Sequence, residues 1–160
     1  SLESRLSPDD PLAAYAGRLR GMAPARFRGY LTGTLDVVAR HPVTGAYWVI
    51  DYKTNSLLGR LGEPAGSAYD PGRLATAMVT HDYVLQALLY QVALHRFLRS
   101  RLPGYDPAAH LGGAMYLFLR GMTGPDTPEA DDGRRGVFTW LAPQALIEDV
   151  DGLFRSGRPA

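Results

Sequence analysis

The chain has 160 residues, of which 46% are hydrophobic and 21% charged, a length and composition typical of one soluble globular domain. It contains no cysteine, which excludes disulfides, zinc–thiolate sites and iron–sulfur clusters, and its net charge of +1 favours no class of partner. The longest uncharged runs have 13 residues, fewer than the roughly 20 that a membrane helix needs, and no signal-peptide pattern is present. We therefore expect a single cytoplasmic domain, residues 1–160, without a membrane span.

Hydrophobic spacing and turn residues predict seven elements. In chain order they are a short helix at 12–19, strands at 27–39 and 46–53, a long helix at 73–101, strands at 113–119 and 137–140, and a helix at 143–154. Residues 41–45 would form the turn of a hairpin between the first two strands. The long helix is apolar around most of its circumference, so we expect it to pack on the sheet with His81 and His95 as packing residues. This order of elements predicts an α/β or α+β fold.

One cluster of polar residues lies on the predicted hairpin. Asp51 and Lys53 are two residues apart in the second strand, so their side chains project from the same face. Asp36 ends the apolar run of the preceding strand, and hairpin pairing can bring it beside Asp51. Two neighbouring carboxylates repel each other unless a cation lies between them, and a hard ion such as Mg²⁺ suits that place. The alternative is that both aspartates are turn residues at the strand ends and that Lys53 only pairs with one of them.

Such a cluster has the groups that phosphodiester hydrolysis requires. A metal ion lowers the pKa of a water and neutralises charge on the phosphate, while a lysine positions or protonates the nucleophile or stabilises the oxyanion. Lys53 is also the only lysine of the chain, since the other 16 of its 17 basic residues are arginine. Because lysine and arginine differ where a compact charge or a shifted pKa is needed, this single lysine indicates a functional position, with chance retention as the alternative.

Three short motifs follow one another along the chain: Gly33-Thr34-Leu35-Asp36, Ile50-Asp51-Tyr52-Lys53-Thr54-Asn55 and Gln86-Ala87-Leu88-Leu89-Tyr90. They resemble the G-x-x-D, D-Y-K and Q-x-x-x-Y motifs of the RecB-type nucleases of the PD-(D/E)XK superfamily. Segments 90–98 and 112–121 are similar to that family as well, and the resemblance runs from about residue 10 to residue 154. Each motif is weak alone, but the three in order at these spacings are specific.

The resemblance implies an α/β fold, in which a PD-(D/E)XK core has a mixed sheet flanked by helices and a long helix after the D-Y-K strand. It also implies that Asp36 and Asp51 are catalytic metal ligands and that the main-chain carbonyl of Tyr52 is a third ligand. Lys53 would be the catalytic lysine. The implied cofactor is Mg²⁺, which Mn²⁺ or Ca²⁺ can replace in binding.

The third motif implies a contact with the substrate. Gln86 and Tyr90 lie one helical turn apart and would offer an exposed amide and hydroxyl to DNA. Plain helix packing is the alternative for this pair.

The family also has a histidine metal ligand on a helix before the first motif. All four histidines of this chain follow Asp36, so none of them can be that ligand: His41, His81, His95 and His110. The nuclease domain is therefore expected to be truncated on its N-terminal side or to lack the ligand. With one ligand missing, we expect the isolated chain to bind metal weakly and to cleave DNA feebly or not at all.

The function that the resemblance implies is a metal-dependent exodeoxyribonuclease domain of a helicase–nuclease that processes DNA double-strand-break ends for recombinational repair. Its partners would be DNA, RecC-like and RecD-like chains and, further, the RecA recombinase. The alternative is a non-catalytic module with a nuclease fold that binds single-stranded DNA or docks a recombinase. A third interpretation, an unrelated PD-(D/E)XK enzyme such as a restriction endonuclease, conflicts with the near-full-length resemblance. Metal-dependent cleavage that a change of Lys53 abolishes would separate the first interpretation from the second.

Overall fold

The computed structural model describes residues 5–20, 32–57, 62, 66–130 and 133–156. Its centre is a four-stranded sheet in the order β1-β2-β3-β6. The strands are β1 (Val37–Arg40), β2 (Tyr47–Lys53), β3 (Leu111–Phe118) and β6 (Val137–Trp140). β1 and β2 pair antiparallel, β2 and β3 pair parallel, and β3 and β6 pair antiparallel. The mixed sheet of an α/β fold is thereby confirmed, with β2 and β3 as its central strands.

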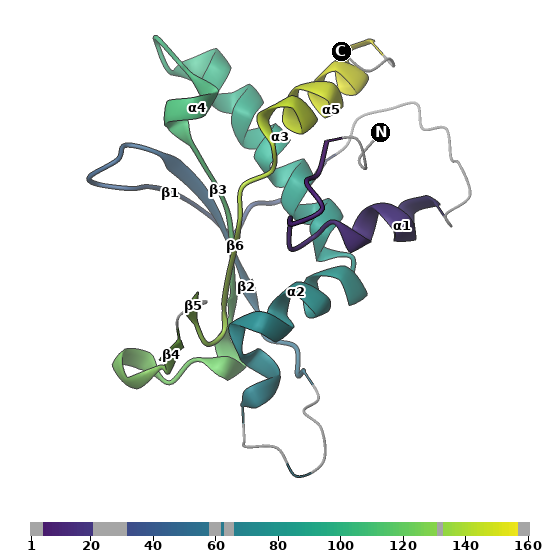
Figure 1. The fold of residues 1–160 in the computed structure, drawn as a ribbon. Helices are drawn as coiled ribbons and strands as arrows, with labels where there is room; N and C mark the ends of the chain where they lie inside the picture. Colours follow the sequence, from purple (N-terminus) through teal and green to yellow (C-terminus); the bar gives the residue numbers. More distant parts are fainter. Residues whose placement is uncertain (1–4, 21–31, 58–61, 63–65, 131–132, 157–160) are drawn as a thin grey trace.

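The helices lie largely in the connection between β2 and β3, because parallel neighbours need a long crossover. This connection contains η2 (Ser67–Tyr69), α2 (Pro71–Thr80), α3 (Tyr83–Arg101) and α4 (Pro107–His110), while α1 (Ala14–Arg20) precedes the sheet and α5 (Gln144–Ser156) follows it. Figure 1 shows α1, α2, α3 and α5 on the same side of the sheet. Between β3 and β6 lie η3 (Leu119–Gly121), η4 (Gly124–Asp126) and a small second sheet of β4 (Glu129–Ala130) and β5 (Gly133–Arg134).

The core lies between the sheet and these helices. Alternate residues of the central strands face the helices and are buried: Val49 and Asp51 of β2, and Ala114, Tyr116 and Phe118 of β3. They form one cluster with buried apolar residues of α2 and α3, among them Leu74, Met78, Val84, Leu88 and Val92. Each large apolar side chain buried in this way contributes roughly 1.5–3 kcal/mol to stability.

The predicted hairpin is confirmed, but its first strand is shorter than expected. β1 pairs with β2 along its whole length and begins only at Val37, whereas the sequence predicted a strand over 27–39. Residues 32–36 form no strand, and 27–31 lie outside the described residues. The backbone pairing of β1 with β2 begins at Val37. At the position before it, the Asp36 side chain contacts β2 instead, since its Oδ2 accepts a hydrogen bond of 3.1 Å from the backbone N–H of Tyr52.

The predicted long helix over 73–101 was wrong as one element, since α2 ends at Thr80 and α3 begins at Tyr83. Asp82, between them, has φ 57°, a left-handed conformation that an α-helix excludes. Contacts from α1 hold it there: Arg18 donates to the Asp82 carboxylate at 2.8 Å, and the Tyr15 hydroxyl donates at 3.3 Å. Residues far away in the sequence therefore contact the break, whereas the apolar spacing of the sequence continues across it.

Because of this break, the environment predicted for one histidine was wrong. His81 follows the last residue of α2 and is exposed, so it is not the packing residue that the sequence predicted. Its ring stacks on Tyr83 with 5.4 Å between the centroids. His95, in contrast, is 4% exposed and packs inside as predicted.

A buried carboxylate joins α3 to α5. Asp151 is 1% exposed, and its oxygens lie 2.9 Å from Arg99, 3.3 Å from Arg155 and 3.5 Å from Arg96. Burial acts to raise the pKa of Asp151, but the three guanidinium groups outweigh burial and hold it below its ordinary value. The carboxylate therefore stays ionised and fixes α5 against the second half of α3.

The remaining expected elements are confirmed, with small shifts of their ends. The expected strands at 113–119 and 137–140 are β3 and β6, and the expected helices at 12–19 and 143–154 are α1 and α5. The helices in the described part of the chain are all too short or too polar to cross a membrane.

Candidate active site

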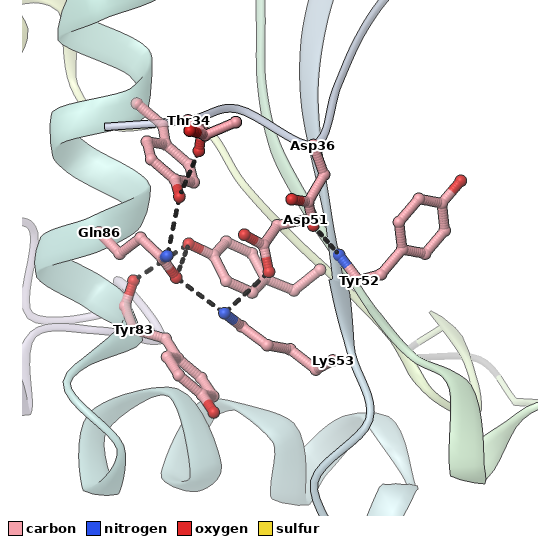
Figure 2. Close-up of polar contacts among 9 residues, drawn as sticks. Thr34, Asp36, Asp51, Tyr52, Lys53, Tyr83 and Gln86 are labelled. Atoms are coloured by element: carbon pink, nitrogen blue, oxygen red, sulfur yellow. Dashed lines mark hydrogen bonds and ion pairs between the residues drawn. The ribbon is translucent and has the colours of Figure 1, made fainter. Parts of the chain in front are cut away.

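The β1–β2 hairpin brings the two predicted aspartates together. Val37 pairs with Ile50, so Asp36 and Asp51 take the next position of the register. Figure 2 shows the two carboxylates side by side, Asp51 from the strand and Asp36 from the residue before β1. Asp51 is only 4% exposed, whereas Asp36 is exposed to solvent. The site therefore has one carboxylate embedded in the core and one at its rim.

Lys53 lies beside Asp51, which confirms that their side chains share a face of the sheet. Its Nζ is 2.8 Å from Asp51 Oδ2, and the lysine side chain is 12% exposed. The Tyr52 side chain projects to the other side and is 47% exposed, so only the main chain of this residue is available to the site (Figure 2). Strand alternation alone gives this arrangement.

Gln86, in the first turn of α3, connects the helix to the lysine. Its Oε1 accepts a hydrogen bond of 2.8 Å from Lys53 Nζ, and its Nε2 donates one of 2.8 Å to the Tyr90 hydroxyl. Tyr90 in turn donates to the backbone carbonyl of Thr34 at 3.0 Å. Both motif residues are half-buried and hydrogen-bonded within the chain, so the expectation of an exposed amide and hydroxyl was wrong.

Two tyrosines complete the surroundings of the lysine. The Nζ of Lys53 lies 4.0 Å from the ring centroid of Tyr83 and 5.1 Å from that of Tyr116. The Tyr116 hydroxyl donates to Gln86 Oε1 at 3.1 Å, and burial, more than the nearby Asp51 charge, raises the pKa of this hydroxyl and keeps it a donor. Sequence analysis missed both tyrosines as site residues. Tyr83 could have been found three residues before Gln86 on the same helix face, whereas Tyr116 depends on the β2–β3 register.

The electrostatics of the site follow from burial and from the two negative charges. Burial raises the pKa of Asp51 above its ordinary value and the Asp36 charge raises it further, while the contact with Lys53 acts in the opposite direction. Asp51 Oδ2 is buried and, apart from the ion pair with Lys53, receives no hydrogen bond from the described part of the chain. Two repelling carboxylates and an oxygen with spare lone pairs fit a hard divalent cation, for which Asp36, Asp51 and the Tyr52 carbonyl are suitable donors.

The four histidines have other environments. His41 accepts hydrogen bonds in the hairpin turn, His81 stacks on Tyr83, His95 lies near Tyr105, and His110 contacts the Asp106 backbone. None of these places is at the two aspartates. Within the described ranges, no group of three or more His, Cys, Asp or Glu side chains could hold a metal ion. Among the described residues, a metal at this site would therefore find its donors in two carboxylates and main-chain oxygen.

The fold defines the class of this protein, an α/β domain with a mixed four-stranded sheet flanked by helices, which is consistent with a PD-(D/E)XK-like core and carries two carboxylates and a lysine at its β-hairpin. Comparison with curated proteins identifies relatives of this chain. The chain is 50% identical over 159 residues to the RecBCD enzyme subunit RecB of Mycobacterium tuberculosis strain CDC 1551. It is 46% identical over 162 residues to the RecB subunit of Mycolicibacterium smegmatis and 39% identical over 156 residues to that of Escherichia coli K12.

These matches include nearly the whole chain and a small part of each relative. They cover 98%, 99% and 96% of this chain but only 14%, 15% and 12% of the respective RecB subunits. No family model matches the chain. The chain is therefore homologous to one segment of the RecB subunits.

Proposed function

We propose that this chain is the metal-dependent DNA nuclease domain of a helicase–nuclease that processes double-strand-break ends for recombinational repair. The observation that carries the proposal is the cluster of Asp36, Asp51 and Lys53, in which a half-buried ammonium lies 2.8 Å from a buried carboxylate on the same strand face. The name of the relatives, a subunit of the RecBCD enzyme, supports DNA and RecC-like and RecD-like chains as partners.

In this proposal Asp36, Asp51 and the main-chain carbonyl of Tyr52 hold Mg²⁺, which Mn²⁺ or Ca²⁺ can replace in binding. When bound, the cation neutralises phosphate charge and lowers the pKa of a water. Asp51 is fixed by the strand and by burial, so its oxygens are held in place before substrate arrives. The Lys53 ammonium lies 2.8 Å from Asp51 Oδ2 and can stabilise negative charge that develops on the phosphate.

Gln86 and Tyr90 are proposed to contact DNA from the first half of α3. Their hydrogen bonds to Lys53, Thr34 and each other leave one amide N–H of Gln86 and one acceptor position of the Tyr90 hydroxyl for a substrate. Gln86→Ala and Tyr90→Phe should weaken DNA affinity more than they lower the melting temperature, and the loss should vary with salt if phosphate is contacted. A large fall in melting temperature with unchanged DNA affinity would identify them as packing residues.

The decisive experiment uses the complete helicase–nuclease. We expect Asp36→Ala, Asp51→Ala and Lys53→Ala each to abolish cleavage of linear duplex DNA while ATP-driven unwinding continues. Lys53→Arg should also be poor, because a guanidinium is larger and does not release its proton. Asp149→Ala is the matched control, since this aspartate pairs with Arg5 on the surface of α5. Near-normal cleavage by Lys53→Ala would contradict the proposal and favour a non-catalytic module.

A further inference from the structure

We infer that Tyr83 and Tyr116 are positioning residues that hold the Lys53 ammonium at Asp51 by forming an aromatic cage around it. The inference rests on the proposed function, in which Lys53 is catalytic, and it assigns the two tyrosines a role in that reaction. The two rings come from α3 and β3, and both lie against a side chain of β2.

The cage is built from contacts on several sides of one nitrogen. Nζ of Lys53 lies 2.8 Å from Asp51 Oδ2, 2.8 Å from Gln86 Oε1 and 4.0 Å from the ring centroid of Tyr83. An ammonium has three N–H donors, so two carry the oxygen contacts and the third can point to the electron-rich face of a ring. The Tyr116 ring, at 5.1 Å, adds a second aromatic surface. Figure 2 shows the lysine nitrogen between Asp51 and Gln86, above the Tyr83 side chain.

The rings of the cage are themselves fixed. Tyr83 and Tyr116 stack with 5.9 Å between their centroids, and Tyr116 is 1% exposed. The Tyr116 hydroxyl donates to Gln86 Oε1 at 3.1 Å and lies 3.4 Å from the backbone carbonyl of Tyr83. One hydroxyl therefore connects the ring, the amide that accepts from Lys53 and the start of α3.

Without the two rings, the Lys53 side chain would be less firmly held beside Asp51. Its four-carbon stem is flexible, and water would compete for the ammonium if the rings were absent. The rings exclude water from one side, which leaves the side chain 12% exposed, and attract the cation without forming a bond that a reaction must break. The ammonium can therefore leave Asp51 for a phosphate oxygen without moving out of the cage.

The sequence allows a direct test in the 160-residue chain. Because Lys53 is its only lysine, labelling with lysine that carries ¹³C at Cε gives a single lysine NMR signal. The nearby rings should shift this signal away from the position of an exposed lysine. Tyr83→Leu should return it toward that position, whereas Tyr83→Phe should leave it near the wild-type value. Tyr47→Leu, which removes a ring that lies 6.0 Å from Arg40, is the matched control and should change nothing.

Cleavage by the complete helicase–nuclease gives the second test. We expect Tyr83→Leu to lower kcat for linear duplex DNA about tenfold, with KM nearly unchanged, and Tyr83→Phe to restore most of the rate because the ring face remains. A lysine signal that stays at the wild-type position in Tyr83→Leu, or normal kcat in that variant while Lys53→Ala is inactive, would overturn the cage. Equal loss in Tyr83→Phe and Tyr83→Leu would overturn it too, since the hydroxyl would then carry the effect. Normal cleavage by Lys53→Ala contradicts the proposed function instead, and the NMR result does not depend on that outcome.

Discussion

The Nζ of Lys53, at the end of β2, lies 2.8 Å from the Oε1 of Gln86 in the first turn of α3. This contact joins two motifs that are 33 residues apart in the chain. Because lysine is only a donor, the oxygen of the amide must face it, and the amide nitrogen is left for Tyr90. The glutamine therefore orients the lysine, and Tyr90 orients the glutamine.

Gln86→Ala tests this relationship. Hydrogen bonds to charged groups contribute about 1.5–3 kcal/mol, so loss of the Oε1 contact should reduce kcat for DNA cleavage by about tenfold or more. The measurement is single-turnover cleavage at saturating DNA, where weakened DNA binding does not affect the rate. Gln144→Ala is the control, since this glutamine donates to Glu148 on the exposed side of α5. An unchanged single-turnover rate would show that Gln86 does not act through Lys53.

Strand alternation made part of this site predictable. A period of two places Asp51 and Lys53 on one face, and a hairpin with a short connection, residues 41–46, places Asp36 beside Asp51, so local rules suffice for both. The apolar character of 113–119 likewise predicts a central strand, since β3 is buried between β2 and β6.

Long-range contacts account for what the sequence did not reveal. The break between α2 and α3 lies at Asp82, which contacts Tyr15 and Arg18 more than 60 residues earlier, and the apolar spacing contains no sign of it. The place of Tyr116 in the site depends on its pairing with Asp51 in the parallel β2–β3 register. Such registers are set by packing of the whole sheet, which single-sequence periodicity does not encode.

The metal site should be weak in the isolated chain. Two carboxylates and one carbonyl leave half of a six-ligand shell to water, and loss of supporting groups commonly weakens metal affinity by roughly 10–100-fold. We expect residues 1–160 to bind Mn²⁺ with a dissociation constant in the millimolar range, measured by titration calorimetry. Asp36→Asn should weaken binding further, while Asp126→Asn, in η4, should not change it. Micromolar affinity would show that Asp36, Asp51 and Tyr52 suffice by themselves.

His95 should make stability depend on pH. Its Nε2 lies 3.3 Å from Arg99 and its Nδ1 lies 2.9 Å from the Tyr105 hydroxyl. Since a guanidinium only donates, Nε2 is an acceptor and the ring is neutral. Burial, and then the Arg99 charge, lower the pKa of His95 from its ordinary value; Asp151 and Glu148 act to raise it, and Arg155 acts with Arg99.

The direction of the effect follows from proton uptake. With the folded-state pKa of His95 lowered, the unfolded chain takes up the proton first as pH falls below about 6.5, which favours unfolding. Above that pH both states are neutral and the histidine contributes no pH dependence. Urea unfolding at pH 7.5 and 5.5 should show a larger loss of stability in the wild type than in His95→Gln, because all other groups are common to both. Equal losses in the two proteins would contradict this prediction.

Gly112 in β3 should be required by packing rather than by backbone conformation. A Cβ at this position would overlap the Trp48 indole of the neighbouring strand, at Nε1, Cε2 and Cδ1. Overpacking of this kind typically costs about 1–3 kcal/mol, so Gly112→Ala should lower the free energy of unfolding by about that amount in urea titrations. Gly33→Ala is the control, since a Cβ there meets no atom of the described residues within 4 Å. If Trp48 is the cause, Gly112→Ala should cost much less in a Trp48→Leu background, and the double-mutant cycle should show clear coupling between the two sites. Additive losses would locate the strain elsewhere in β3.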